Sequence, residues 1–179
     1  MSTRVAGAES SIVRSKDDLV GWIAAGEKPK SAWRIGTEHE KFVFYTESLE
    51  PVPYGGNRGI RALMEGLCAC CRWLPIMEGD NIIALRRPEG EIGGTISLEP
   101  GGQFELSGAP VATLHETAAE TDEHLREVLR VGERLGIGFL GVGFSPKWTL
   151  AETPRMPKER YGVMTRYMPM VGDLRRPPD

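Results

Sequence analysis

A long helical repeat over residues 111–135 constrains the fold more than any other pattern in the sequence. Apolar residues recur along one face of this segment, and acidic residues such as Glu116, Glu120 and Glu123 lie off that face. The apolar face consists of Val111, Leu114, Ala118, Leu125, Val128, Leu129 and Leu135. An apolar stripe of this kind is typical of a surface helix that packs against a core. The segment therefore predicts one long amphipathic helix.

Shorter helical and strand patterns make up much of the remaining chain. The spacing of apolar residues predicts helices over 10–25, 60–71 and 158–168. Aromatic, β-branched and continuous apolar runs predict strands over 33–45, 81–85, 95–98, 103–106 and 137–144. A turn at 89–94 is expected to join two of these strands in a hairpin. Helices and strands mix without strict alternation, which favours an α+β fold with an antiparallel sheet over a doubly wound fold.

The composition is that of a globular protein with one domain. The 179 residues include 22 Lys and Arg against 25 Asp and Glu, a formal net charge of −3. This balance excludes a basic nucleic-acid footprint over the whole chain and a general positive field toward anionic membranes. No apolar run reaches the ~18 residues of a membrane-spanning helix, and residues 1–10 lack the apolar region of a signal peptide. A cytoplasmic protein is therefore expected.

The three cysteines form one cluster, Cys68, Cys70 and Cys71. An odd, clustered set does not provide a disulfide framework. Cys68 and Cys71 form a C-x-x-C pair, for which redox or metal chemistry is an alternative, but a zinc site needs two further ligands and there is no second C-x-x-C. We expect buried or half-buried free thiols.

Two glutamates close together on the first expected strand are candidate metal ligands. Residues two apart on a strand point to the same face, so Glu38 and Glu40 project together while His39 projects the other way. Buried carboxylates repel one another unless a cation compensates them. Mg²⁺ is suited to this role because it takes one or two carboxylates together with water and phosphate oxygens. The alternative is a pair of glutamates on a solvated face.

A second group of polar residues flanks a Pro-Gly-Gly turn. Gln103 and Glu105 share one strand face, and Glu99 precedes the turn. Glycines at such a turn let the backbone bend sharply or approach a ligand closely. These residues are expected to extend the first carboxylate pair across a sheet. The alternative is an edge hairpin with polar residues pointing outward.

Other candidate patterns carry less information. The Gly136-x-Gly138-x-x-Gly141 spacing matches a dinucleotide fingerprint, but it follows a helix and precedes Ser-Pro instead of joining a strand to a helix, so it is rejected. His115 and His124 are interpreted as surface or boundary residues of the long helix. Basic residues Lys158, Arg160 and Arg166 either meet phosphates or carboxylates or belong to a solvated charged helix.

Taken together, these motifs resemble the plant and proteobacterial type of glutamate–cysteine ligase, also called γ-glutamylcysteine synthetase. The matching segments follow one order and span almost the whole chain. They read IGTEHEKF at 35–42, EGDNIIAL at 78–85, SLEPGGQFELSG at 97–108, GFLGVGFSPKW at 138–148 and PKERYGVMTRYMP at 157–169. Five long motifs in order are difficult to obtain by chance.

The resemblance implies a fold and a reaction. The implied fold is a glutamine-synthetase-like antiparallel sheet with flanking helices, α+β in class, whose concave face holds metal, ATP and substrates. The implied reaction is the first step of glutathione synthesis. The γ-carboxylate of glutamate attacks the γ-phosphate of ATP, and the amine of cysteine then displaces phosphate from γ-glutamyl phosphate.

The resemblance also implies roles for particular residues. Metal ligands for Mg²⁺ would be Glu38, Glu40, Glu99 and Glu105. Gln103 and Lys41 would contact the cofactor, ATP. Arg160 and Arg166 would be the catalytic residues that meet substrate carboxylate or phosphate.

The sequence departs from the family pattern after residue 174. Family members continue to more than twice this length, whereas RRPPD at 175–179 does not resemble them. Residues 1–174 are therefore expected to form the N-terminal part of one catalytic domain, with an incomplete sheet, and 175–179 a tail outside the family. A chain of this kind is expected to be weakly active or inactive and prone to aggregate. The alternatives are a related ATP-dependent carboxylate–amine ligase with another acceptor, or a non-catalytic fragment that binds a separate C-terminal portion.

Overall fold

A computed structural model describes residues 12–89 and 93–171, and these residues form an α+β fold around one antiparallel sheet. The order of its six strands is β2-β3-β4-β5-β1-β6, and each neighbouring pair is antiparallel. The strands are β1 (Glu38–Tyr45), β2 (Leu74–Glu78), β3 (Asn81–Arg86), β4 (Thr95–Leu98), β5 (Phe104–Ser107) and β6 (Ile137–Leu140). This confirms the expected fold class. The tail expected at 175–179 lies outside the described residues.

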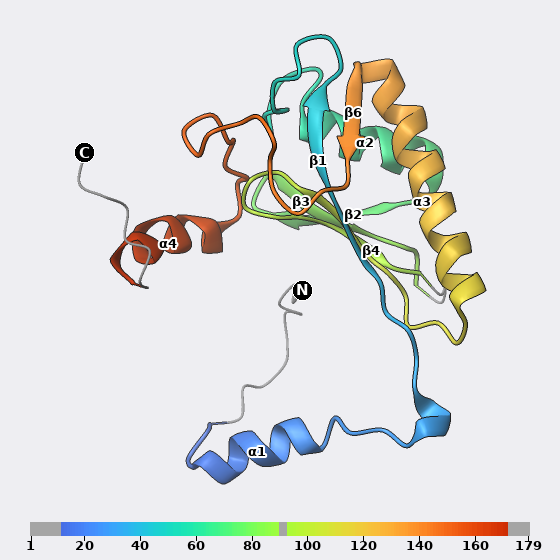
Figure 1. The fold of residues 1–179 in the computed structure, drawn as a ribbon, viewed down its shortest axis with the longest axis vertical. Helices are drawn as coiled ribbons and strands as arrows, with labels where there is room; N and C mark the ends of the chain where they lie inside the picture. The colour runs from blue at the N-terminus through green and yellow to red at the C-terminus, as the bar shows by residue number, and fades with distance from the viewer. Residues whose placement is uncertain (1–11, 90–92, 172–179) are drawn as a thin grey trace.

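Two helices cover one face of the sheet, and a third stands on the other side. The helices are α1 (Lys16–Ala24), α2 (Ile60–Cys71), α3 (Leu114–Leu135) and α4 (Glu159–Tyr167), with short 3₁₀ turns η1 (Lys30–Ala32) and η2 (Met168–Met170). Figure 1 shows α2 and α3 against the sheet and α4 on the side away from α3. The core lies between the sheet and the α2–α3 layer, where Leu63, Leu67 and Leu98 are fully buried. The opposite sheet face is therefore left for polar side chains.

The long helix α3 forms as predicted, but its buried face is rotated from the predicted one. A capping box between Thr113 and Glu116 begins the helix, and Gly136 ends it with a φ of 67°. Leu114 and Leu129, which were expected on the buried face, are 73% and 53% exposed. The buried residues are His124, Glu127, Val128, Val131 and Gly132. Polar residues can lie on this face because the Glu127 carboxylate accepts a hydrogen bond from Trp73 Nε1 at 2.7 Å.

The expectation that His124 lies at the surface or a boundary is wrong, since only 2% of this residue is exposed. Its ring stacks on Phe104, with ring centroids 6.4 Å apart. Burial disfavours the charged imidazolium, and together with the nearby charge of Lys41 it lowers the pKa of His124 to about 3. The histidine is therefore neutral in the folded protein at physiological pH.

This buried histidine makes stability depend on pH. An unfolded histidine takes up a proton near pH 6.5, whereas folded His124 does so only near pH 3. The unfolded chain binds more protons between these values, so the free energy of unfolding falls as pH drops through this window. From pH 7 to pH 5 we expect wild type to lose about 1–2 kcal/mol more than His124→Gln in urea titrations. His115→Gln, at an exposed position of α3, is the matched control; equal pH slopes for wild type and His124→Gln would refute the assignment.

The cysteines differ from the expectation of three free thiols. Cys68 is free and half-buried, whereas the adjacent Cys70 and Cys71 are joined by a disulfide in the last turn of α2. Burial raises the pKa of the Cys68 thiol, which favours its protonated form.

The first helix, α1, stands apart from the sheet in Figure 1 and buries none of its residues. The chain between α1 and β1 is tied to the body by an antiparallel bridge between Ile35 and Val111. Among the described residues, no helix is both long and apolar enough to cross a lipid bilayer.

Candidate functional site

The polar face of the sheet presents carboxylates from the neighbouring strands β1 and β5 and a serine from β4. On β1, His39 and Lys41 pair with the core residues Leu106 and Phe104, so Glu40 points to the opposite face. Glu40 pairs with Glu105 of β5, which in turn pairs with Ser97 of β4. Side chains directly opposite each other on one face of an antiparallel pair have Cβ atoms about 5 Å apart. The β1 and β5 carboxylates that the sequence grouped separately are therefore neighbours.

Glu105 is the most buried carboxylate on this face, with 2% of the residue exposed. It accepts hydrogen bonds from Ser97 Oγ at 3.0 Å and from Ser107 Oγ at 2.9 Å. Burial alone would raise the pKa of Glu105, but the hydroxyls of Ser107 and Ser97 stabilise the charged form and hold its pKa below the usual range. Glu105 is therefore a fixed negative charge in a site that holds its side chain in one position.

Glu99 completes a coupled pair with Glu105. It is 8% exposed, and one carboxylate oxygen, Oε1, is buried without a hydrogen-bond partner. Burial and the neighbouring Glu105 carboxylate raise the pKa of Glu99, and the cations Lys158 and Arg160 only partly oppose this shift. The pKa of Glu99 is raised while that of Glu105 is lowered. Two neighbouring buried carboxylates repel each other when both are charged. A cation placed between them would relieve the repulsion.

The Pro-Gly-Gly segment forms the turn that positions Glu99. The Gly102 amide donates to Glu99 O at 2.9 Å, and the Glu99 amide donates to Gln103 O at 3.0 Å. Gly102 has a φ of 84°, a conformation that other residues adopt only with strain. Gln103 lies beside this turn, and its buried Oε1 has no hydrogen-bond partner. The backbone of Gln103 is thus tied to that of Glu99 through the turn, and a ligand-binding role for its side chain stays a prediction.

Cationic side chains reach the same site from the segment that leads into α4. Lys158 Nζ donates to Leu98 O at 2.7 Å, and the Tyr161 hydroxyl donates to the same carbonyl. Arg160 lies over the Tyr161 ring, and its Nη2 is 3.9 Å from Glu99 Oε1. Burial lowers the pKa of Lys158 and the adjacent Arg160 lowers it further, while Glu99 favours its charged form. Two cations therefore lie beside the carboxylate pair.

Of the other predicted site residues, Lys41 and Arg166 lie away from this face, and Glu38 lies on it at the start of β1. Lys41 lies on the core face of β1, is 2% exposed, and donates to the carbonyl of His39 at 2.6 Å. Burial lowers the pKa of Lys41 to about 8, although Glu105 and Glu40 favour its charged form. Glu38 pairs with Ser107 at the start of β1. Arg166 is exposed on α4.

The sequence offered Lys158 with Arg160 and Arg166 as possible phosphate or carboxylate contacts, but it gave no site role to Tyr161, Ser97 or Ser107. Lys158 was visible as one of the basic residues around Tyr161, but a sequence does not show which of them turns inward. The two serines alternate with apolar residues on β4 and β5. That alternation was the signal that placed them on the face of Glu105.

The oxygen atoms on this face meet only part of the requirement of a hard divalent cation. Carboxylate oxygens are ligands that Mg²⁺ prefers, and Oε1 of Glu99 is buried without a hydrogen-bond partner. In residues 12–89 and 93–171, however, no three His, Cys, Asp or Glu side chains come close enough to hold a metal by themselves. A pair of carboxylates fits Mg²⁺ that is completed by water and phosphate oxygens. It does not fit a metal held by four glutamates alone.

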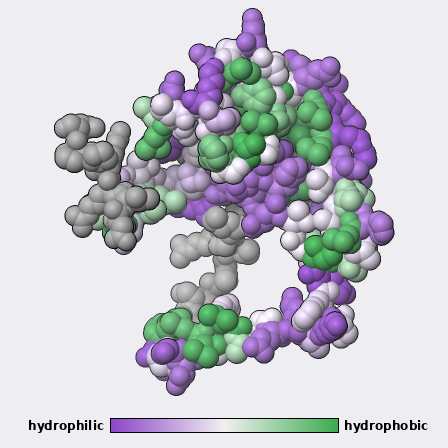
Figure 2. Space-filling model, viewed as in Figure 1, coloured by the Kyte–Doolittle hydropathy of each residue, from purple (hydrophilic) through white to green (hydrophobic). Residues whose placement is uncertain are grey.

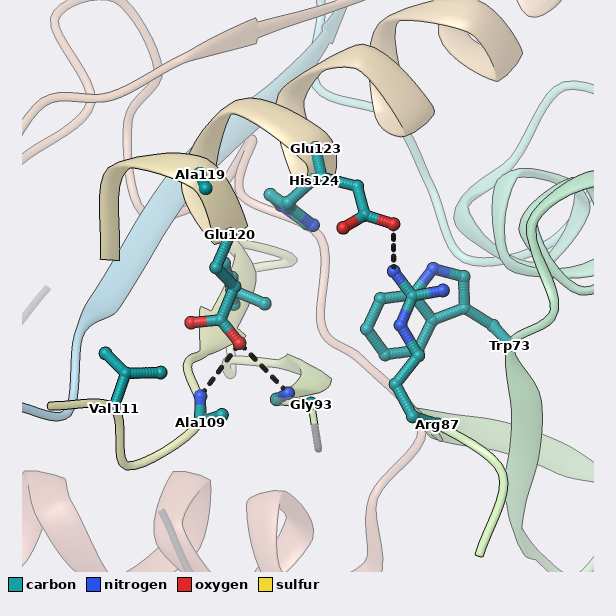
Figure 3. A pocket seen from close by; sticks show the side chains of 11 residues that line it. Trp73, Arg87, Gly93, Ala109, Val111, Ala119, Glu120, Glu123 and His124 are labelled. Carbon is teal, nitrogen blue, oxygen red and sulfur yellow. Dashed lines mark hydrogen bonds and ion pairs between the residues drawn. The ribbon is translucent and has the colours of Figure 1, made fainter. Parts of the chain in front are cut away.

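A separate cavity of about 180 Å³ lies on the other side of the sheet, under α3. Figure 3 shows Trp73, Arg87 and Glu123 at one end and Glu120 at the other. Arg87 stacks on Trp73 and pairs with Glu123 and Glu127. These charged groups already satisfy one another, so this cavity is a weaker candidate site than the carboxylate face.

Known proteins resemble this chain over most of its length. The model of glutamate–cysteine ligase family 2 matches residues 34–177. Over 160 residues the chain is 52% identical to the chloroplastic glutamate–cysteine ligase A of Oryza sativa subsp. japonica. This match covers 89% of the chain and 31% of the rice relative. The chloroplastic ligases of Nicotiana tabacum and Arabidopsis thaliana are 53% and 50% identical over the same length, again 89% of this chain and 29% of each relative.

The expectation of a cytoplasmic protein is contradicted by these relatives, which are chloroplastic enzymes. An apolar region marks secretory signal peptides, whereas chloroplast transit peptides are amphipathic and rich in serine. The lack of an apolar region in residues 1–10 therefore gave no information about a chloroplast location.

The chain spans about 30% of the length of the curated relatives that it matches. The family match itself covers the strands that carry the carboxylates and the segment that carries Lys158 and Arg160. On this match, the chain belongs to glutamate–cysteine ligase family 2.

Proposed function

We propose that this chain provides part of the active site of an ATP- and Mg²⁺-dependent ligase that joins the γ-carboxylate of L-glutamate to the amine of L-cysteine. This is the first step of glutathione biosynthesis. The observation that carries the proposal is the coupled Glu99–Glu105 pair with Lys158 and Arg160 beside it. Carboxylates for a metal and cations for phosphate are the groups that phosphoryl transfer requires, because that chemistry depends on positioning and charge neutralisation.

The proposed reaction has two steps. A γ-carboxylate oxygen of glutamate attacks the γ-phosphorus of ATP, the bond to the bridging oxygen breaks, and ADP leaves. The amine of cysteine then attacks the acyl carbon of γ-glutamyl phosphate, inorganic phosphate leaves with the bonding electrons, and the nitrogen loses a proton as the amide forms. The first step concentrates negative charge on the transferred phosphoryl group, which cations must balance.

Each group on the polar face has a role in this proposal. Glu99 and Glu105 would hold Mg²⁺, which when bound would neutralise phosphate charge, and Glu40 lies on the same face opposite Glu105. Gln103 offers an amide oxygen to the nucleotide or its metal. Arg160 and Lys158 attract phosphate or substrate carboxylate. Peripheral Glu38, exposed Arg166 and core-facing Lys41 remain family-based assignments that the geometry does not support directly.

The proposal assigns residues 1–174 to the N-terminal part of one catalytic domain, since the chain spans about 31% of the rice relative. The partner of this chain is then the remaining portion of such a ligase. We expect the chain alone to form γ-glutamylcysteine at less than about 1% of the rate of the chain co-expressed with the part of the rice enzyme outside the matched 160 residues. Active-site groups that act as a unit lose most of their catalytic effect when some of them are missing.

Product analysis by mass spectrometry provides the test. Cysteine is supplied in parallel with serine, glycine and alanine, each with glutamate and ATP. Selective γ-glutamylcysteine formation supports the proposal, and preference for another amine would assign the chain to a related carboxylate–amine ligase. An isolated chain as fast as the co-expressed pair would contradict the need for a complementing portion.

A further inference from the structure

An arm at the start of the described chain exposes an unusual concentration of apolar side chains. We define this arm as residues 12–33, which contain α1 and η1. On α1, Trp22 is 80% exposed and Ile23 is 76% exposed, and Trp33 after η1 is 63% exposed. Figure 2 shows hydrophobic side chains gathered over α1 at the edge of the molecule. Large apolar patches rimmed by polar residues mark interaction sites.

The arm contains the helix α1 although none of the residues of α1 is buried. Ser15 and Asp18 make a complete capping box at the start of α1. An isolated helix of nine residues is marginal in water, and helices of this length depend on packing of an apolar face. The sequence of α1 therefore specifies a helix whose packing partner lies outside residues 12–89 and 93–171.

The arm precedes the family-model match, which begins at residue 34, but part of it lies within the match to the rice ligase. The match to the rice ligase includes 160 of the 179 residues, which leaves 179 − 160 = 19 residues outside it. The arm has 22 residues, so part of it lies inside the match. The match covers 31% of the rice relative, so about two-thirds of that relative's length lies outside it. A family-length ligase therefore contains further polypeptide that is long enough to cover the arm.

The polar face of the sheet also lacks partners. Glu99 Oε1, Gln103 Oε1 and Arg160 Nε are buried without hydrogen-bond partners among the described residues. The remaining portion of a family-length ligase is long enough to cover both this face and the arm.

We infer that the α1 arm, through Trp22 and Ile23, is the docking element for the remaining portion of a family-length ligase, an inference that rests on the function proposed above. The docked polypeptide presents an apolar groove to α1. Because α1 contributes nothing to the core, its apolar residues are available for this contact without any cost to the fold of the sheet.

The test co-expresses the full 179-residue chain, carrying an affinity tag, with the part of the rice ligase outside the matched 160 residues. We expect the two polypeptides to co-purify and α1 amides to exchange hydrogen at least about 100-fold more slowly in the complex than in the chain alone. The double variant Trp22→Glu/Ile23→Glu should retain at most about one tenth of the partner. Leu129→Glu, which places the same charge on an exposed leucine of α3, is the matched control and should retain it fully.

The outcomes separate this inference from the proposed function. The Glu99→Gln/Glu105→Gln variant should retain the partner like wild type. Loss of nucleotide binding in this variant therefore tests the carboxylate site separately from docking by the arm. Equal recovery of the partner by the arm variant and wild type would overturn the inference. Failure of the wild-type chain to co-purify with the partner would also overturn it. So would a homodimer of this chain, detected by sedimentation, in which hydrogen exchange shows that α1 is protected.

Discussion

Substitution of Glu99 and Glu105 by glutamine is expected to weaken binding of Mg²⁺-ATP about 100-fold or more. Both carboxylates are buried, and each glutamine replaces a charged oxygen by a neutral amide of nearly the same shape. Charge-assisted interactions contribute about 1.5–3 kcal/mol each, and a 100-fold change corresponds to about 2.7 kcal/mol. Isothermal titration calorimetry on the chain co-expressed with its complementing portion measures the dissociation constant.

The single variants sharpen this test. Glu105 accepts two serine hydroxyls, at 2.9 and 3.0 Å, and its charge is fixed in place. Glu105→Gln is therefore expected to have the larger effect, and Ser97→Ala an intermediate one. Glu38→Gln, at the start of β1, is the matched control, and we expect it to change the affinity less than about threefold. An affinity that depends on Glu38 as strongly as on Glu105 would move the metal site toward the end of the sheet.

Phe104→Ala is expected to lower the free energy of unfolding by about 3–5 kcal/mol. Phe104 is fully buried, and its ring lies 6.4 Å from His124 and 6.3 Å from Phe139, measured between ring centroids. Removing the ring leaves a cavity between β5 and α3 that rigid neighbours cannot fill. Because a domain of this size is stabilised by only about 5–15 kcal/mol, the variant should unfold at much lower urea concentration.

Two companion variants keep this prediction testable if Phe104→Ala does not fold. Phe104→Leu retains most of the volume and should cost about 1–1.5 kcal/mol. Leu129→Ala removes a side chain from a residue that is 53% exposed and should change stability by less than about 0.5 kcal/mol. Urea titrations followed by circular dichroism compare the three. Equal costs for Phe104→Ala and Leu129→Ala would show that β5 does not pack on α3 as described.

Local patterns predicted much of the fold because they depend on short-range rules. The alternation on β1 placed Glu40 on one face and His39 on the other, and the structure agrees. The strand β2 was missed because Pro75 interrupts its pattern, and an edge strand tolerates proline where a central strand does not. An antiparallel sheet was predictable from the order of elements, whereas its strand order was not.

Tertiary contacts decided what the sequence could not. The polar residues His124 and Glu127 are typical of a solvent-facing helix surface, yet both are buried on α3. Trp73 and Arg87 provide buried partners for the Glu127 carboxylate, so this face of α3 packs against the core. Lys41 stands one residue from Glu40, but strand geometry sends it into the core. Lys158 reaches the site only because the segment before α4 folds back over Leu98, a contact 60 residues away in sequence.

The most direct measurement of the central claim follows oxygen-18 from glutamate. The chain, co-expressed with the complementing part of the rice ligase, is incubated with ATP, cysteine and glutamate labelled in its γ-carboxylate, and the released phosphate is analysed by mass spectrometry. A γ-glutamyl phosphate intermediate predicts one oxygen-18 atom in each phosphate, in step with γ-glutamylcysteine formation, and loss of both signals in Glu99→Gln/Glu105→Gln. Product formed with unlabelled phosphate, or no product from a stable complex, would contradict the account.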